Sequence, residues 1–415
     1  MKRERSIWIV WSVLLSVLLS VGTRVEAQSL TWLGTLPGGN QSEASGVSAD
    51  GAVVVGTAYN ASGQWLAFRW TASGGMQNLG TLPDFDYSRA SGVSADGAVV
   101  VGHAQNASEQ LRAFRWENGV MQDLGTLGGD YSEAYGVSAD GSVVVGTSEN
   151  ASLQYRAFRW TASGGMQDLG TLPDGSRSWA YGVSADGSVV VGMALNASSQ
   201  GRAFRWTASG GMQDLDTLPG GYGSWAYGVS ADGAVVVGIA QNASWSWRAF
   251  RWTASGGMQD LGTLPGGNGS EAYDVSVDGS VVVGMARNAS GQPRAFRWTP
   301  SGGMEDLNTT YASLLTGSFL VAAYAVSPDG RYIVGGGYNA ATGRYEAYLL
   351  DTGPRCVSHT GDVDNNGCVD DADLLAILFA FGQSGDALGR VDVNCDQRVD
   401  DADLLEVLFH FGSGC

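Results

Sequence analysis

Two acidic segments near the end of the chain have the residue types and spacing of a calcium-binding loop. Asp362–Asp373 reads DVDNNGCVDDAD, and Asp392–Asp403, thirty residues later, reads DVNCDQRVDDAD. Such a twelve-residue loop supplies oxygens from positions 1, 3, 5, 9 and 12 and a carbonyl from position 7. The predicted ligands of the first loop are Asp362, Asp364, Asn366, the Cys368 carbonyl, Asp370 and Asp373. Those of the second are Asp392, Asn394, Asp396, the Arg398 carbonyl, Asp400 and Asp403.

The matching spacing favours two Ca²⁺ sites over a solvated acidic tail, because a carboxylate cluster this dense repels itself without a cation. Gln397 stands where the sharp turn of such a loop prefers Gly. We therefore expect the second site to bind calcium more weakly than the first.

Each loop runs into a short apolar segment, Leu374–Phe381 and Leu404–Phe411, that predicts a helix. The arrangement of a loop followed by a helix occurs twice, and neither copy has the leading helix of an EF-hand. This arrangement resembles a type I dockerin over Gly361–Gly412. The resemblance implies a cohesin-like module on a scaffold or cell surface as the partner. It assigns partner recognition to loop positions ten and eleven, which are Asp371, Ala372, Asp401 and Ala402. The helices lack the basic residues usual in that family.

All four cysteines of the chain lie in this region, and four cysteines allow three pairings. Cys356 and Cys415 flank the module, so the first expectation is a disulfide between them. That pairing leaves Cys368 with Cys395.

Aromatic residues that vary from repeat to repeat are a second candidate for function. They follow or precede recurrent turns and would gather on one rim, where flat rings beside carboxylates suit sugar rings. The alternative is that these positions vary between repeats only because surface loops tolerate many residue types. The candidate ligand-binding residues are Trp65, Tyr155, Trp179, Trp225 and Trp247. Glu43, Glu133 and Glu271 are the acid–base candidates for a hydrolase or lyase, but their recurrence at one site of separate repeats favours a surface ring.

The elements that position these residues repeat along the chain. The turn sequence V-S-x-D-G occurs at seven places, and its aspartates are spaced at intervals of 46, 44, 46, 46, 46 and 51 residues. One unit, Ala180–Gly221, contains four β-type runs separated by turn residues and leaves no room for a helix. The expected strands are 181–184, 188–194, 202–206 and 212–218. Four antiparallel strands in about 45 residues are typical of a β-propeller blade.

The two ends of the array indicate closure into a ring. The seventh unit ends at Leu350 without a fourth strand, and the missing sequence occurs as Leu30–Leu36, which aligns with Met76–Leu82. The N-terminal strand can therefore complete the last blade, which removes an exposed sheet edge. The predicted fold is mainly β, a seven-bladed propeller of four-stranded blades plus a small α-helical module. The rival is an open or stacked β-array.

The A-F-R-W strands and V-S-x-D-G turns resemble the extracellular HAF-repeat family over Leu30–Leu350, and the resemblance implies an extracellular repeat protein without an established reaction. Within the A-F-R-W strands, we expect the Phe and Trp to pack between blades and the Arg to face the other way and pair with a turn Asp. The recurrent Asn-Ala-Ser segments fit N-glycosylation or a turn that places Asn in the left-handed region. The seventh unit has Asn339 without the hydroxyl residue, which favours the turn.

The N-terminus has the pattern of a secretory signal peptide. A basic stretch, Met1–Arg5, precedes an apolar run, Ile7–Gly22, and Ala27 ends a small-residue cleavage site. The rival is a membrane anchor, for which sixteen apolar residues are short. The predicted organisation is a signal peptide at 1–27, a propeller at 29–351, a linker at 352–360 and the calcium module at 361–415.

Composition narrows the function. The chain carries 23 basic and 41 acidic residues, a net charge of −18, which argues against nucleic acid and anionic membranes as partners. A single lysine and three histidines make lysine-based and multi-histidine chemistry unfavourable. The leading hypothesis is a secreted, non-catalytic binding protein whose propeller face binds an extracellular glycan or protein and whose C-terminal module docks through calcium. The alternatives are an extracellular enzyme of polysaccharide catabolism and a structural surface protein.

Overall fold

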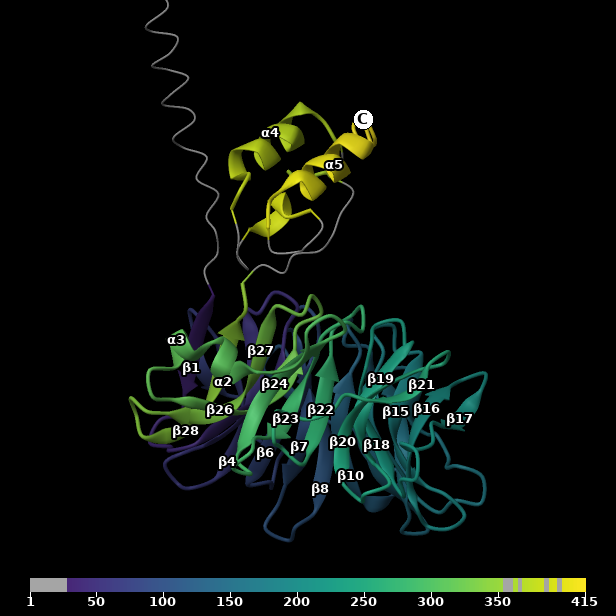
Figure 1. Ribbon diagram of the computed structural model, residues 1–415. Coiled ribbons are helices and arrows are strands. Elements are labelled where there is room, and N and C mark those ends of the chain that lie inside the picture. Colours follow the sequence, from purple (N-terminus) through teal and green to yellow (C-terminus); the bar gives the residue numbers. More distant parts are fainter. Residues whose placement is uncertain (1–27, 354–360, 365–367, 384–387, 394–397) are drawn as a thin grey trace, which may run out of the picture. The chain divides into compact units, whose positions relative to one another are not determined.

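The computed structural model describes residues 28–353, 361–364, 368–383, 388–393 and 398–415. Asn366, Asn394, Asp396 and Gln397 lie outside these ranges, as do Cys356 and Cys395 and the predicted signal peptide. Ser29–Thr352 form one compact unit, and the described residues from Gly353 onward belong to another (Figure 1).

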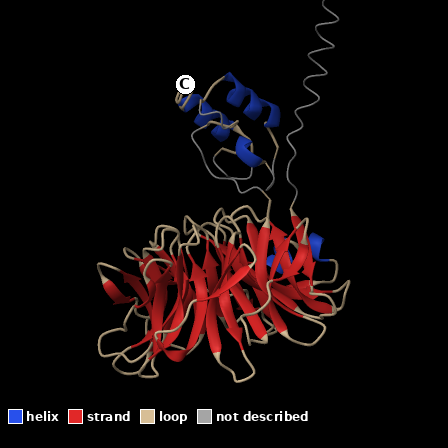
Figure 2. Ribbon diagram, turned by 180° about the vertical axis from the view of Figure 1, so that it is seen from behind, coloured by secondary structure: helices blue, strands red, loops and turns tan. Residues whose placement is uncertain are grey.

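The first unit is a propeller of seven four-stranded antiparallel sheets, as predicted (Figure 2). Blade 1 comprises β2 (Ser42–Val47), β3 (Val53–Tyr59), β4 (Trp65–Thr71) and β5 (Gly75–Asn78). Blade 2 comprises β6 (Tyr87–Val93), β7 (Val99–Gln105), β8 (Leu111–Glu117) and β9 (Val120–Asp123). Blade 3 comprises β10 (Gly128–Val137), β11 (Val143–Asn150), β12 (Tyr155–Thr161) and β13 (Gly165–Asp168). Blade 4 comprises β14 (Ser178–Val183), β15 (Val189–Leu195), β16 (Gly201–Thr207) and β17 (Gly211–Asp214).

The remaining blades continue this order and end with the strand that closes the ring. Blade 5 comprises β18 (Ser224–Val229), β19 (Val235–Gln241), β20 (Trp247–Thr253) and β21 (Gly257–Asp260). Blade 6 comprises β22 (Ser270–Val275), β23 (Val282–Arg287), β24 (Pro293–Thr299) and β25 (Gly303–Asp306). Blade 7 comprises β26 (Phe319–Val326), β27 (Tyr332–Asn339), β28 (Arg344–Asp351) and β1 (Ser29–Gly34).

The N-terminal strand β1 closes the ring, which confirms the prediction from Leu30–Leu36. It pairs antiparallel with β28, from Ser29 opposite Asp351 to Gly34 opposite Ala347. Leu33 and Leu36 are buried in a cluster shared by blades 7 and 1. The last blade is therefore built from both ends of the propeller sequence.

Buried serines join neighbouring blades in a recurrent way. The Ser178 hydroxyl at the start of β14 accepts the Ala157 N–H of blade 3 at 2.9 Å and donates to the Gly170 carbonyl at 2.5 Å. Because a buried hydroxyl needs partners, this pair of bonds fixes the distance between two blades. The same bond to the preceding blade is made by Ser42, Ser88, Ser132, Ser224 and Ser270.

The turns between first and second strands form a ring of their own, called here the turn ring. Its members are Ala49, Ala95, Ala139, Ala185, Ala231, Val277 and Pro328. Each of the first six donates its N–H to the carbonyl of the next member at 2.9–3.2 Å. The seventh link cannot form in this way, because Pro328 has no N–H to donate to Ala49.

The aromatic strands pack as predicted, but their arginines have a different partner. Phe158 is fully buried and Trp160 is 7% exposed, whereas the Arg159 Nε donates to the Gly187 carbonyl of the next blade at 3.1 Å. The expected partner was the turn aspartate. That carboxylate instead accepts within its own turn, as Asp186 does from Ser184 at 2.7 Å and from the Ser188 N–H at 2.9 Å.

The Asn-Ala-Ser segments are turns, but asparagine does not occupy the left-handed position. Asn242 Oδ1 accepts the N–H groups of Ser244 and Ser246 at 3.0 and 3.1 Å, which shapes the turn from the side chain. The residue with positive φ lies three positions later, and in blade 5 it is Trp245, at φ 59°.

Two short helices, α2 (Leu307–Thr310) and α3 (Ala312–Leu315), connect blades 6 and 7 and were not predicted. They occupy the interval of 51 residues, the longest between turn aspartates. Leu307, Tyr311 and Leu315 are buried against β26–β28, so the added residues extend the core.

The second unit contains α4 (Asp371–Ala380), a 3₁₀ turn η1 (Gly389–Val391) and α5 (Asp401–Phe409). Asp370 and Asp400 cap the two helices in matching capping boxes with Asp373 and Asp403. Each loop pairs with the end of the other helix: Val369 exchanges backbone bonds with Gly412 and Ser413, and Val399 with Gly382 and Gln383. The core is formed by Val363, Val369, Ile377, Ala380, Val393, Val399 and Val407.

Among the described residues, none of the helices reaches the length and apolar character that crossing a membrane requires.

Candidate functional site

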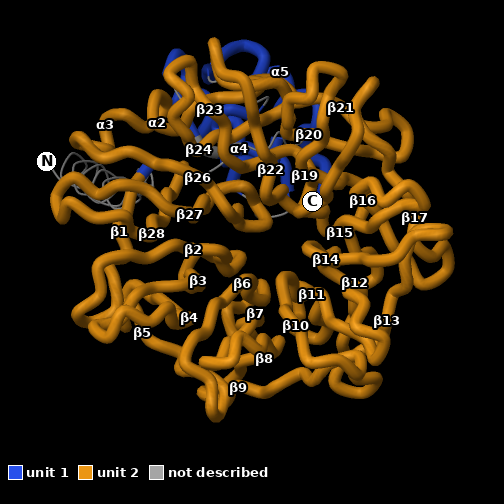
Figure 3. Tube along the Cα trace, turned by 90° about the horizontal axis from the view of Figure 1, so that it is seen from below, with its two compact units in different colours: residues 1–28, 353–415 blue, residues 29–352 orange. Residues whose placement is uncertain are grey.

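The first strands of the blades lie around the centre of the ring (Figure 3), and their side chains line a central cavity. The residues one place after the buried serines share one register in the seven blades, and two of them, Glu43 and Arg89, line this cavity. The residues at this register are Glu43, Arg89, Glu133, Trp179, Trp225 and Glu271, with Ala322 in blade 7. Two places further along the first strands, five blades have a tyrosine that lines the cavity.

The predicted aromatic residues are half-buried, because they pack against one another on the rim. Tyr155 and Trp179 stack across blades 3 and 4, with centroids 6.0 Å apart and planes at 24°. Trp225 and Trp247 lie 5.1 Å apart within blade 5, and Trp65 lies 4.0 Å from Tyr59 in blade 1. The structure thus brings four of the five candidates together in two pairs, whereas Trp65 packs against Tyr59.

A more exposed aromatic pair, Tyr222 and Trp245, lies in the same blade 5 loops. Trp245 is 69% exposed and Tyr222 is 48% exposed, and their rings stack at 5.8 Å and 28°. Trp245 occupies the left-handed turn position that blades 1 and 6 fill with Gly63 and Gly291. A bulky side chain there is unfavourable by about 1 kcal/mol or more. Sequence reasoning missed Trp245, although its place three residues after Asn242 in the repeat would have revealed it.

The central channel contains a cavity of about 680 Å³. Five of the seven blades line it with a tyrosine from the first strand, called here the tyrosine arc, and blades 1 and 2 have Ser45 and Ser91 instead. Neighbouring rings of the arc lie 5.3–5.9 Å apart. The members of the arc are Tyr135, Tyr181, Tyr227, Tyr273 and Tyr324.

Charged groups border the arc. The Tyr135 hydroxyl donates to Glu133, and the Tyr273 hydroxyl donates to Glu271 at 3.0 Å. Burial, with added repulsion from Glu133, raises the pKa of Tyr181 to about 12, so its hydroxyl stays neutral. Burial also raises the pKa of Glu43, against the opposing effect of Arg89.

Two further titratable groups lie in the channel wall. Burial raises the pKa of Asp274 to about 6, although the N–H groups of Val326 and Val275 both donate to its carboxylate. Burial lowers the pKa of His103, and Glu133, whose carboxylate lies 3.9 Å from Nε2, opposes that shift. His103 is therefore largely neutral at pH 7.

In the second unit, three predicted metal ligands come together. Carboxylate oxygens of Asp362, Asp364 and Asp373 lie within 4.8 Å of one another, and no other such group of His, Cys, Asp or Glu occurs among the described residues. Asp373 is fully buried, and its Oδ1 accepts the N–H groups of Val363 and Asp364 at 2.6 and 3.0 Å. These bonds shape the loop around the carboxylates, and an all-oxygen donor set of this kind suits a hard divalent cation.

The second loop has the same framework. Asp403 is fully buried and accepts the Asp400 N–H at 2.9 Å, and Asp392 is 3% exposed. The backbone carbonyls of the first loop also have a side-chain partner, because Arg390 Nε donates to the Val363 carbonyl at 3.0 Å. The predicted partner-reading residues Asp371, Ala372, Asp401 and Ala402 are exposed at the starts of α4 and α5.

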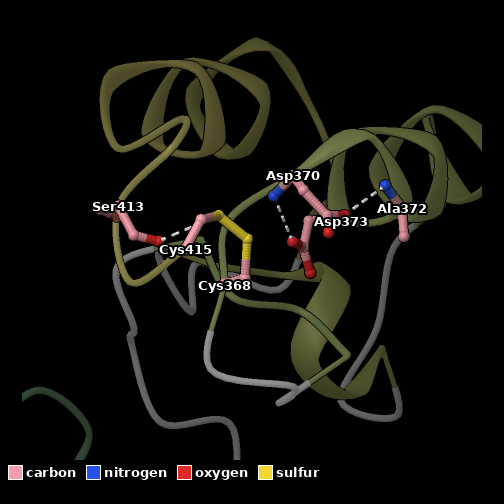
Figure 4. Close-up of a disulfide and its surroundings, with 6 residues drawn as sticks. All are labelled: Cys368, Asp370, Ala372, Asp373, Ser413 and Cys415. Atoms are coloured by element: carbon pink, nitrogen blue, oxygen red, sulfur yellow. Dashed lines mark hydrogen bonds between the residues drawn. A yellow bond between two sulfur atoms is a disulfide. The ribbon is translucent and has the colours of Figure 1, made fainter.

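The disulfide pairing differs from the expectation. Cys368 bonds to Cys415, with Cα atoms 4.7 Å apart (Figure 4), so the predicted Cys356–Cys415 and Cys368–Cys395 pairs are both wrong. Val369 already pairs with Gly412 and Ser413, which brings Cys368 beside the C-terminal residue. The disulfide therefore forms where the first loop pairs with the end of the second helix. The positions of Cys356 and Cys415 at the two ends of the module do not reveal this pairing.

Comparison with known proteins finds likeness in structure alone. No protein-family profile matches the chain. No curated protein matches it either. Among solved structures, the oligogalacturonate lyase of Vibrio parahaemolyticus aligns with TM-score 0.52 and 11% identity, over 78% of this chain and 93% of that one. A TolB protein of Acinetobacter baumannii aligns with TM-score 0.42 and 11% identity, over 70% and 76%. At these identities the likeness establishes the β-propeller fold and no more.

Proposed function

We propose that this chain is an exported binding protein whose propeller recognises an extracellular glycan and whose C-terminal module docks on a partner through calcium. The observation that carries the proposal is the concentration of aromatic rings in the strands and loops of blade 5. Trp225 and Trp247 form a tilted pair there, Tyr222 and Trp245 form a stacked pair, and Trp245 occupies an unfavourable backbone position. Accessible rings on a rigid sheet scaffold suit the apolar faces of sugars.

Calcium docking is supported by the acidic cluster and by the surface of the two helices. The Asp362, Asp364 and Asp373 carboxylates would hold the cation, and Asp373 links it to the start of α4. Both helices expose apolar residues at matching positions, which is unusual unless a partner covers them. The exposed residues are Leu375, Leu378 and Phe379 in α4 and Leu405, Leu408 and Phe409 in α5. A cohesin-like module is the partner that the loop pattern implies.

Export is supported by the sequence pattern of residues 1–27 and by the Cys368–Cys415 disulfide, since disulfides persist in oxidising compartments.

The propeller proposal is tested by screening the purified mature protein on a glycan array. Trp225→Ala should weaken the strongest interaction by at least about tenfold, because aromatic anchors dominate many interfaces. A thermal melt of the variant must accompany the screen, since Trp225 is half-buried. A screen in which the wild-type protein retains no glycan would reject the proposal.

A second function, polysaccharide cleavage, is favoured by one observation. Glu43 lines the channel with a raised pKa, as a general acid requires. Polysaccharide turnover assayed on the same glycans decides between the two. Product formation that Glu43→Gln abolishes would favour the enzyme, whereas binding without turnover favours the binding protein.

A further inference from the structure

The tyrosine arc has a chemistry of its own, distinct from the aromatic rim. Its rings come from five consecutive blades, and their planes meet at 67°, 53°, 55° and 35°. The rings therefore do not lie flat on one another, so the arc presents both π-electron density and hydroxyl oxygens to the cavity. Within the described part of the chain, the hydroxyls of Tyr181, Tyr227 and Tyr324 make no hydrogen bond.

Carboxylates outnumber cations around this cavity. Glu43 and Asp274 line it, and Glu133 and Glu271 accept hydrogen bonds from two members of the arc. A tyrosine hydroxyl that donates to a carboxylate becomes more electron-rich, which strengthens the attraction of its ring for positive charge.

The positive charge lies on the other side. Among the described residues, Arg89 is the only arginine or lysine that lines the cavity. Its guanidinium lies 5.9 Å from the centre of the Trp65 ring, at blades 1 and 2, where Ser45 and Ser91 interrupt the arc. His103 is neutral and adds no charge. The aromatic wall is thus bordered by Asp274, Glu133 and Glu271, whereas Arg89 interacts with Glu43 of blade 1.

A metal ion does not suit this wall. Divalent cations need several carboxylate or imidazole atoms close together, and among the described residues the only such cluster is in the second unit. Phenol rings and single hydroxyls instead match an ammonium group, which gains from ring faces and donates to neutral oxygens.

We propose that the tyrosine arc is a binding site for an organic ammonium group, either a free alkylammonium ion or the side-chain amine of a lysine. This proposal does not rest on glycan binding.

The test is calorimetric titration of the mature protein with tetramethylammonium and with n-butylammonium, whose chain matches a lysine side chain. The neutral alcohols 2-methylpropan-2-ol and n-butanol match these two ions in size and shape and serve as ligand controls. We expect millimolar binding of an ammonium ion and weaker binding of the matching alcohol. Preference for n-butylammonium would indicate a lysine source, and preference for tetramethylammonium a quaternary ligand.

The chain itself supplies the matched variant. Tyr227→Ser introduces the residue that Ser45 and Ser91 already place at this register, so the blade should fold. It should weaken ammonium binding about five- to thirtyfold. Tyr87→Ser makes the same chemical change at an exposed site outside the cavity and should leave the affinity unchanged.

Three results would overturn the proposal. They are the absence of ammonium binding in the millimolar range, equal binding of an ammonium ion and its neutral counterpart, and an affinity that Tyr227→Ser leaves unaltered while the variant melts as a folded protein.

Discussion

Leu36 offers a quantitative test of ring closure by the N-terminal segment. It is 3% exposed and packs between blades 7 and 1, whereas its counterpart Leu172 is 2% exposed between blades 3 and 4. The two side chains have the same surroundings, but only Leu36 depends on the N-terminal strand being in place. Truncation of a buried leucine leaves a cavity and costs about 2–5 kcal/mol. Leu36→Ala and Leu172→Ala should therefore lower the free energy of unfolding by similar amounts in that range.

The assay is urea denaturation followed by tryptophan fluorescence, with the midpoint and slope compared across both variants. Equal midpoint shifts are expected. The reasoning would be refuted if Leu172→Ala lowered the midpoint and Leu36→Ala did not, because the N-terminal segment would then contribute nothing to the core.

Three further changes should have defined effects. Ser178→Ala removes the acceptor of the buried Ala157 N–H and should cost about 1–3 kcal/mol in thermal or urea unfolding; a neutral result would show that the serine bonds do not join the blades. Hydrogen bonds from Ser184 and Ser188 lower the pKa of Asp186 from 3.8 to about 2. The stability that this ionised carboxylate adds is complete above pH 4 and is lost as the pH falls toward 2, so the melting temperatures of wild type and Asp186→Asn should converge on acidification. Chelation of calcium by EGTA should unfold residues 361–415 and leave the propeller folded, and Asp373→Asn should have the same effect. Limited proteolysis with and without calcium measures this, and identical cleavage sites under both conditions would contradict it.

The sequence carried enough information for the architecture. The regular Asp-Gly spacing predicted seven blades, and the truncated seventh unit together with Leu30–Leu36 predicted how the ring closes. These features could be predicted because each blade buries both faces of its sheet with the same pattern of residues, so the pattern repeats in the sequence. The helices α2 and α3 occur only once, in the longest interval between turn aspartates. Because they do not recur, the repeat pattern could not predict them.

The site was less predictable, because it depends on which residues meet across blades. The sequence identified Trp225 and Trp247 as functional candidates but did not predict that their rings pack against each other. It placed Tyr181 on a strand, whereas only the ring geometry makes that residue one of five tyrosines around a cavity. Likewise, Cys368 meets Cys415 through the crossed pairing of loop and helix end, which has no signature in the spacing of the cysteines.

The central claim, that the rim aromatics bind an extracellular glycan, is tested most directly by a matched pair of variants. Trp245→Gly and Leu153→Gly change the same left-handed turn position in blades 5 and 3, and the two side chains are 69% and 67% exposed. Glycine suits that backbone conformation, so neither change should unfold the protein. The measurement is the affinity of wild type and both variants for the strongest glycan from the array. The account predicts that Leu153→Gly binds as wild type does and that Trp245→Gly loses at least about tenfold; equal affinity of all three proteins would contradict it.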